Sequence, residues 1–249
     1  MEATTIDDVL THLDAIIATS KNELSTIGYF AAMYRTVTQT VKNNLGTDFF
    51  QNDDRMEKLD VIFANRYLKA YSDYNQGKDV TASWKYSFEE SKNNRLIVLQ
   101  HLMLGMNTHI NLDLGVAAAQ ISTPENIEDL KIDFNKINEI LGGLVERMER
   151  DLSEITPFLN TIIKIFKNFD KKLINFSMTI ARNGAWKFAN KIVGKSDLDL
   201  QNIIKERDLK IIKLSDGIVN SGFFKGLLFK ILRFCEKGNV ETKIEAMEK

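Results

Sequence analysis

The chain has 249 residues, in which 33 Lys and Arg balance 34 Asp and Glu, and this length suffices for a sizeable core in one large domain or two small ones. The near-zero net charge gives no support to a nucleic-acid partner, which would require a basic face. The single cysteine, Cys235, excludes an internal disulfide framework and suits a reducing compartment.

The N-terminal residues are acidic where a secretory signal is positively charged, and no apolar segment follows them. We therefore expect the protein in the cytoplasm. Proline at its ordinary frequency of about 5% would occur roughly twelve times in a chain of this length, whereas this chain contains two. So few helix breakers, together with long 3.6-residue hydrophobic periods, predict an all-α protein.

The hydrophobic periodicity predicts a series of helices joined by short turns. Thr5, with Asp8 three residues later, is typical of a capping box that begins the first helix. Gly46 is the expected stop of the second helix. The predicted helices cover the segment after Thr5, then about 29–45, 53–74, a short stretch around Trp84 and Phe88, 95–120, 132–155, 158–168, 171–193, 198–220 and 222–236.

The chain shows no Gly/Ser-rich or Pro-rich linker and no clear repeat. We expect residues 1–237 to form a single-domain multi-helix bundle, and the mostly charged or small residues 238–249 to fray as a tail. The helix at 222–236 is amphipathic and basic, so it could lie on a membrane surface. Docking onto the bundle is the preferred interpretation of its apolar face.

The segment from Leu96 to Leu112 contains no charged Lys, Arg, Asp or Glu across 17 residues. A helix that is apolar all round is either buried or spans a membrane. Spanning is disfavoured because the polar side chains of this segment would lie in hydrocarbon, where ionisable groups are costly. We therefore predict that a buried central helix over about 95–120 is wrapped by the other helices.

Polar side chains interrupt this central helix in an ordered way. At about 100° per residue, two lines of polar positions run along it on nearly opposite sides. The first line consists of His101, Gly105, His109 and Asp113, and the second of Asn107 and Asn111. The glycine clears space between the two imidazoles, although close helix packing explains it equally well.

His109 and Asp113 are four residues apart, so they could bind one divalent metal ion, or the carboxylate could orient a histidine base. His101 is about 12 Å from His109 along the axis, too far to share one metal easily. It would mark the other end of an elongated pocket as an acid or base. We take His101, His109 and Asp113 as candidate catalytic residues, and His109 and Asp113 as candidate metal ligands.

Polar and aromatic residues elsewhere in the chain could complete such a site. Asp60 lies in an apolar stretch and could be a further ligand, or the ion-pair partner of Arg35 or Arg66. Arg182 is four residues from Trp186 and could stack on its indole, which would either clamp an anionic substrate or fasten two helices. The candidate substrate-binding residues are Arg35, Asp60, Arg66, Trp84, Asn107, Asn111, Arg182 and Trp186.

The segment QHLMLGMNTHINLDLG at residues 100–115 resembles the signature of an uncharacterised bacterial family, domain of unknown function 5995. Shorter pieces between about residues 29 and 190 resemble it too, among them Met33-Tyr34-Arg35, Phe63-Ala64-Asn65-Arg66-Tyr67-Leu68 and Ala185-Trp186. The resemblance implies that the candidate catalytic and substrate-binding residues belong to a recurrent polar and aromatic set of the family. It implies no activity, because the family carries none that could be transferred.

Three functions are compatible with a polar cluster on a buried helix. The first is an enzyme, a hydrolase or lyase, that uses a divalent metal or acid–base chemistry on a small, partly apolar substrate. The second is a non-enzymatic binding protein for a lipid-like or isoprenoid-like ligand, whose head group the polar residues recognise. The third is a structural polar core, in which the same residues satisfy one another without any ligand.

Overall fold

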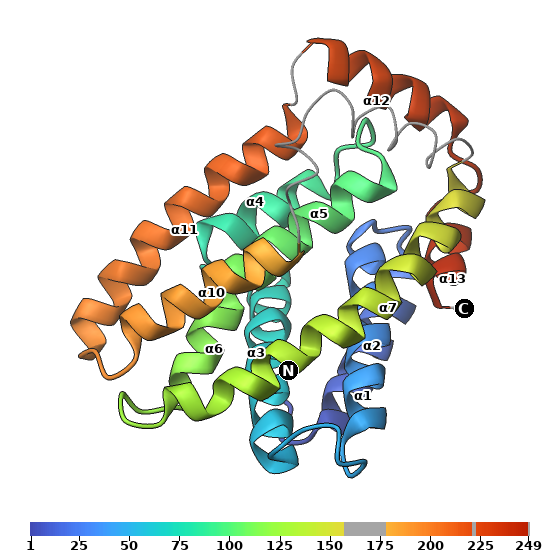
Figure 1. Cartoon of the computed structure of the whole chain (residues 1–249). Coiled ribbons are helices and arrows are strands. Elements are labelled where there is room, and N and C mark those ends of the chain that lie inside the picture. The colour runs from blue at the N-terminus through green and yellow to red at the C-terminus, as the bar shows by residue number, and fades with distance from the viewer. Residues whose placement is uncertain (157–177, 221–222, 249) are drawn as a thin grey trace.

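Every regular element in the described part of the chain, residues 1–156, 178–220 and 223–248 of the computed structural model, is a helix, so the all-α prediction is confirmed (Figure 1). The predicted helix 158–168 and the first seven residues of the one at 171–193 lie outside the described residues. The elements are α1 (Ile6–Asn22), α2 (Ile27–Asn44), α3 (Asp53–Asn75), α4 (Ala82–Glu90), α5 (Val98–Thr108), the π-helix η1 (His109–Asp113), α6 (Leu114–Gln120), the 3₁₀-helix η2 (Ile127–Leu130), α7 (Lys131–Ile155), α10 (Met178–Ile192), α11 (Asp197–Val219), α12 (Phe223–Cys235) and α13 (Val240–Glu248).

The ends of the first helices follow from local sequence chemistry. The Thr5 hydroxyl accepts the backbone N–H of Asp8, and the Asp8 carboxylate accepts that of Thr5, which completes the predicted capping box. Gly46 follows α2 at φ +75°, a left-handed conformation that favours glycine. These signals depend only on neighbours in the sequence, which is why the helix boundaries were predictable.

The central helix consists of α5, η1 and α6, which continue one another without a break. It is enclosed on all sides, since α5 packs against α2, α4 and α11, while η1 and α6 pack against α3 and α10 (Figure 1). In the described part of the chain, no helix combines the length and apolar content needed to cross a membrane. An apolar helix without charges over most of its length is stable here because its neighbours cover it.

The middle of the central helix differs from the regular α-helix that its periodicity predicts. Over His109–Asp113 it widens to a π-helix, in which the Leu114 N–H donates to the carbonyl oxygen of His109 five residues earlier. Such single-turn π segments are uncommon and often occur at functional sites. The extra residue in this turn displaces the positions that follow it, so side-chain directions beyond His109 do not follow the 100° rule.

Gly105 of α5 leaves room for the Phe30 ring of α2. A Cβ at position 105 would lie 2.5 Å from Phe30 Cγ and 3.0 Å from its Cβ, which are not at the flexible end of that side chain. We expect Gly105→Ala to destabilise the protein by about 1–3 kcal/mol through this overlap, outweighing the gain in helix propensity. In the control Gly142→Ala on α7, where a Cβ meets nothing within 4 Å, stability should stay equal or rise. Chemical unfolding of both variants tests the prediction, and an equal response of the two would contradict it.

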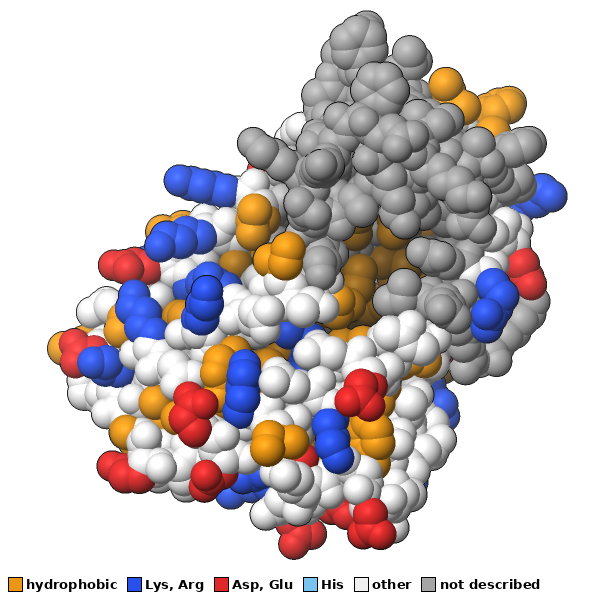
Figure 2. All heavy atoms as spheres, in the orientation of Figure 1, with side chains coloured by type: hydrophobic (Ala, Val, Ile, Leu, Met, Phe, Trp, Pro, Cys, Tyr) orange, Lys and Arg blue, Asp and Glu red, His pale blue; other side chains and the backbone are white. Residues whose placement is uncertain are grey.

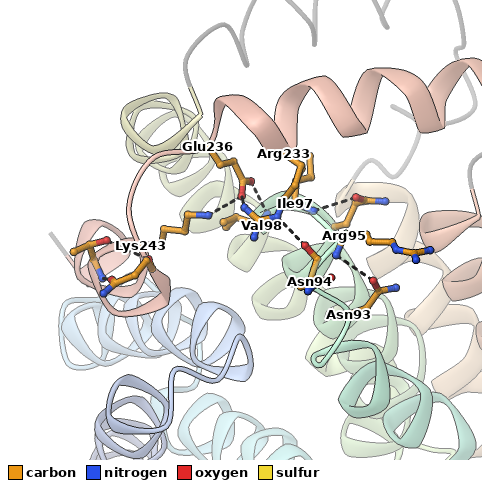
Figure 3. Close-up of polar contacts among 11 residues, drawn as sticks. Asn93, Asn94, Arg95, Ile97, Val98, Arg233, Glu236 and Lys243 are labelled. Carbon is orange, nitrogen blue, oxygen red and sulfur yellow. Dashed lines mark hydrogen bonds and ion pairs between the residues drawn. The ribbon is translucent and has the colours of Figure 1, made fainter.

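The C-terminal segment differs from its prediction, because residues 240–248 do not fray. They form α13, whose Lys243, Ile244 and Met247 are buried where the helix packs on α1, α2 and α7. Glu236, between α12 and α13, joins this segment to the N-terminus of α5 (Figure 3). Its Oε1 accepts the Val98 N–H at 2.8 Å and its Oε2 accepts Lys243 Nζ at 2.7 Å. A carboxylate at a helix N-terminus satisfies a free N–H and complements the helix dipole.

Candidate functional site

Asp113, at the end of η1, accepts hydrogen bonds from three different helices. Its Oδ1 accepts Arg66 Nε of α3 at 2.8 Å, and its Oδ2 accepts Trp84 Nε1 of α4 at 2.9 Å and His109 Nδ1 at 3.1 Å. Asp113 is 1% and His109 2% exposed. The structure thus brings together four of the predicted site residues in one buried cluster.

The charges in this cluster fix the protonation of the histidine. Burial raises the pKa of Asp113, but Arg66, His109 and Trp84 together outweigh it and hold the pKa below its ordinary value. Burial lowers the pKa of His109, against an opposing contribution from Asp113. An ionised carboxylate only accepts, so a neutral His109 must carry its proton on Nδ1 and leave the Nε2 lone pair free.

Aromatic rings hold the imidazole of His109 in one orientation. The Phe63 ring stacks on it at a centroid distance of 3.6 Å and an angle of 9°, and the Tyr34 ring meets it at 4.7 Å and 72°. The rings of Phe30 and Tyr67 contact it at 5.7 and 6.1 Å. Packing by these four rings restricts the rotation that a solvent-exposed imidazole would have.

Among the residues that the structure describes, several buried polar atoms around these rings have no hydrogen-bond partner. They include His109 Nε2, Tyr67 OH and Asp60 Oδ2. The Tyr34 hydroxyl lies near these atoms. Burial and the charges of Asp60 and Asp113 raise the pKa of Tyr34 well above 10, whereas the Thr38 hydroxyl lowers it. Because almost all buried polar groups in proteins are hydrogen-bonded to protein or to ordered water, these atoms are available to bind water or another small polar molecule.

Asp60 forms neither of its predicted ion pairs. Arg35 pairs instead with Asp14 at 2.6 Å on the surface, and Arg66 pairs with Asp113. Burial, with a smaller contribution from Glu57, raises the pKa of Asp60 to about 7. The carboxyl group is therefore largely protonated below neutral pH and could donate a hydrogen bond.

The raised pKa of Asp60 predicts a pH-dependent stability. Since the folded pKa lies above the unfolded value, this group favours folding most below about pH 4, and the advantage is lost as the pH rises through about 7. We expect wild type to lose a few kcal/mol relative to Asp60→Asn between about pH 4 and 8. Urea unfolding across this range measures the difference. The control is Asp54→Asn, at an exposed position of the same helix, whose stability should depend on pH as that of wild type does. If the stability of Asp60→Asn also followed that of wild type across this range, the pKa of Asp60 would not be raised.

His101 lies apart from this cluster, in a small pocket of about 20 Å³ beside α2 and α4. Its Nδ1 is 3.4 Å from the Thr26 hydroxyl, and its ring contacts Tyr29. Burial, reinforced by Arg233 and Lys243, lowers the pKa of His101 to about 3. The ring is thus neutral at physiological pH, which suits hydrogen bonding and disfavours the predicted role as an acid.

The pocket at His101 and the His109 cluster share walls. Phe30, Tyr67 and Trp84 line the pocket, and each of these rings also contacts the His109 imidazole. Gly105 lines the pocket as well, between the two histidines in the sequence. The two histidines therefore lie at two ends of one aromatic cluster, with the Phe30 ring packed against Gly105 between them.

The remaining predicted residues lie elsewhere. Asn107 donates to the Ile211 carbonyl and the Ser215 hydroxyl of α11, and Asn111 donates to Asn107, so this pair fastens α11 to the central helix. The Arg182 guanidinium packs 4.4 Å over the Phe134 ring of α7 rather than on Trp186. Instead, Lys131 Nζ lies over the Trp186 ring, 4.4 Å from its centroid.

His109 and Asp113 do not fit the predicted metal pair. Both Asp113 oxygens already accept N–H donors, and the His109 nitrogen that faces Asp113 is one of these donors. Among the residues that the structure describes, no three or more His, Cys, Asp and Glu side chains form a group able to hold a metal ion. The hydrogen-bond geometry favours the other predicted role, a histidine oriented by a carboxylate.

Sequence reasoning missed Tyr34, Thr38 and Tyr67 as site residues. Tyr34 and Tyr67 occupy apolar stripes of α2 and α3, where a tyrosine is taken as a core side chain. The missed signal is that each carries a hydroxyl into a buried stripe, where it needs a partner.

Comparison with protein-family models matches residues 6–221 to the Family of unknown function (DUF5995). Comparisons with curated proteins and with solved structures gave no match. The matched segment includes every residue of the His109 cluster and ends before α12 and α13. Because the match covers more than half of the chain, the protein belongs to the DUF5995 family.

Proposed function

We propose that this protein is an acid–base enzyme in which His109 acts as the general base. The observation that carries the proposal is the buried Nε2 of His109, which has no hydrogen-bond partner among the described residues, while Nδ1 donates to an ionised Asp113. A base oriented in this way by a carboxylate accepts a proton with little reorganisation.

The neighbouring groups supply the other roles that such a reaction needs. Asp113 orients His109 and stabilises the imidazolium that forms when Nε2 takes a proton. The hydroxyl of Tyr67 and the carboxyl of Asp60 have a free oxygen each, so they are positioned to bind the polar part of a substrate. The aromatic rings around His109 suit a substrate that is small and partly apolar.

The access route proposed for this substrate is the pocket at His101. The pocket reaches Phe30, Tyr67 and Trp84, and a movement of the Phe30 ring away from Gly105 would connect it to His109. Small movements of side chains that gate a buried site are common in enzymes. We assign the reaction to the class of hydrolysis or elimination on a small substrate in the cytoplasm. In this proposal His109 acts as a base and not as a metal ligand.

The alternatives are less well supported by the same contacts. A lipid-like ligand would need a long apolar cavity, so many more side chains would have to move around the pocket of about 20 Å³ at His101 than for a small substrate. A purely structural polar core would satisfy its hydrogen bonds within the protein or with ordered water, whereas His109 Nε2, Tyr67 OH and Asp60 Oδ2 have no partner among the described residues and lie around one imidazole.

Hydrolysis of 4-nitrophenyl acetate, a small and partly apolar ester, tests the proposal. We expect His109→Gln to reduce the rate above background by about 100-fold or more, because general-base catalysis contributes at least that much. His12→Gln, a substitution of the histidine on α1 outside the cluster, is the matched control and should retain the wild-type rate. A wild-type rate no higher than that of a folded His109→Gln variant would refute the acid–base role.

A further inference from the structure

A second cleft lies on the other side of the central helix, between α10 and α11. Both helices pack on η1, and they leave between them a cleft of about 280 Å³. From α10 it is lined by Lys187, Phe188 and Lys191, and from α11 by Ile203, Arg207 and Lys210. None of the predicted site residues lines it, so it is separate from the His109 cluster.

The lining of this cleft carries a strong excess of positive charge. Three lysines and an arginine face a single carboxylate, that of Glu206. Lys187 and Lys191 are four residues apart on one helix, a spacing at which like charges repel. No ion pair with another described residue involves any of the four cations. Figure 2 shows several Lys and Arg side chains, with Asp and Glu side chains between them, over the face where α10 and α11 lie.

Arg207 is held in place at the base of this cleft. Its Nε donates to the Asn111 carbonyl of η1 at 3.0 Å, and its guanidinium lies 5.3 Å over the Phe188 ring. Gly184 on α10 lies beside the guanidinium, where a Cβ would be in ordinary van der Waals contact with Arg207 Nη2, at 3.5 Å. The side chain is therefore half-buried and preorganised, with its terminal N–H donors left for a ligand.

We propose that the cleft between α10 and α11 binds a small organic phosphate. A phosphate carries up to two negative charges and three acceptor oxygens, which matches an anchored arginine among three lysines better than a carboxylate does. The volume approaches that of ordinary small-molecule sites, and Phe188 and Ile203 offer apolar surface to the organic part. The inference is independent of the proposed role of His109.

Isothermal titration with phenyl phosphate at low salt tests this site directly. We expect saturable 1:1 binding, weakened about tenfold or more in the double variant Lys187→Gln/Lys191→Gln, because charge-assisted hydrogen bonds are lost. These two lysines are exposed, so the double variant should fold. The matched control Lys205→Gln/Lys213→Gln removes two exposed lysines of α11 that do not line the cleft, and it should bind like wild type.

The remaining outcomes would overturn the inference. Equal weakening in both double variants would mean that binding follows the general surface charge. Benzoate binding as tightly as phenyl phosphate would exclude a phosphate site, and the absence of saturable 1:1 heat would exclude a binding site altogether. The titration measures only binding in the cleft, whereas the His109 proposal is tested by ester hydrolysis. Each proposal can therefore fail without the other.

Discussion

Replacing Asp113 with alanine is expected to lower the free energy of unfolding by about 3–5 kcal/mol, the range for removing one partner of a buried ion pair. The Asp113 carboxylate is the shared acceptor of Arg66, Trp84 and His109, and it is 1% exposed. Its loss leaves the partly buried guanidinium of Arg66 and the buried N–H groups of Trp84 and His109 without their acceptor. Urea unfolding monitored by circular dichroism measures the change.

Asp14→Ala is the matched control for this prediction. Asp14 also pairs with an arginine, Arg35, at 2.6 Å, but half of its side chain is exposed. Exposed ion pairs contribute less than about 1 kcal/mol, so this variant should remain near wild type. If Asp113→Ala were no more destabilising than Asp14→Ala, the buried cluster would not be held together by Asp113.

Replacing Glu236 with alanine should have an effect of similar size, about 3–5 kcal/mol, because Lys243 is then left buried without its anion. The Glu236 side chain is 1% and that of Lys243 4% exposed. The same substitution removes the acceptor of the Val98 N–H at the start of the central helix, and it releases Arg233, whose Nη1 donates to Glu236 at 3.4 Å (Figure 3). The loss of a helix cap adds about 1 kcal/mol.

Glu241→Ala, at an exposed position of α13, is the control for the second prediction and should change stability little. A double substitution, Glu236→Ala with Lys243→Met, should recover part of the loss, because an apolar side chain leaves no unpaired buried charge. Hydrogen exchange of the Val98 amide distinguishes a local from a global effect. If Glu236→Ala matched Glu241→Ala in stability, the C-terminal segment would not stabilise the central helix through this carboxylate.

The two predictions together connect the family core to the segment beyond it. Asp113 lies inside the residues matched by the family model, and Glu236 lies after them. Both carboxylates hold the same central helix, one at η1 and one at the N-terminus of α5. The charges of Arg233 and Lys243 that surround Glu236 also reinforce the lowered pKa of His101, so the C-terminal segment influences the pocket at that histidine.

The sequence by itself determined most of the helices and one contact within them. Hydrophobic period, the Thr5–Asp8 capping box and the glycine after α2 are local signals, and the structure follows them closely. The burial of the central helix was predictable for the same reason, because a segment without charges must be covered. The contact between His109 and Asp113 needed only their spacing along one helix.

Tertiary structure alone decided which distant residues meet. Arg66 pairs with Asp113 and Arg35 with Asp14, so neither pairs with Asp60, and Arg182 packs on Phe134 rather than on Trp186. These outcomes depend on the rotation of each helix about its own axis and on the π-helix at η1, which periodicity cannot specify. The buried face of α13 was missed because packing against three other helices, and not local composition, keeps the C-terminal residues folded.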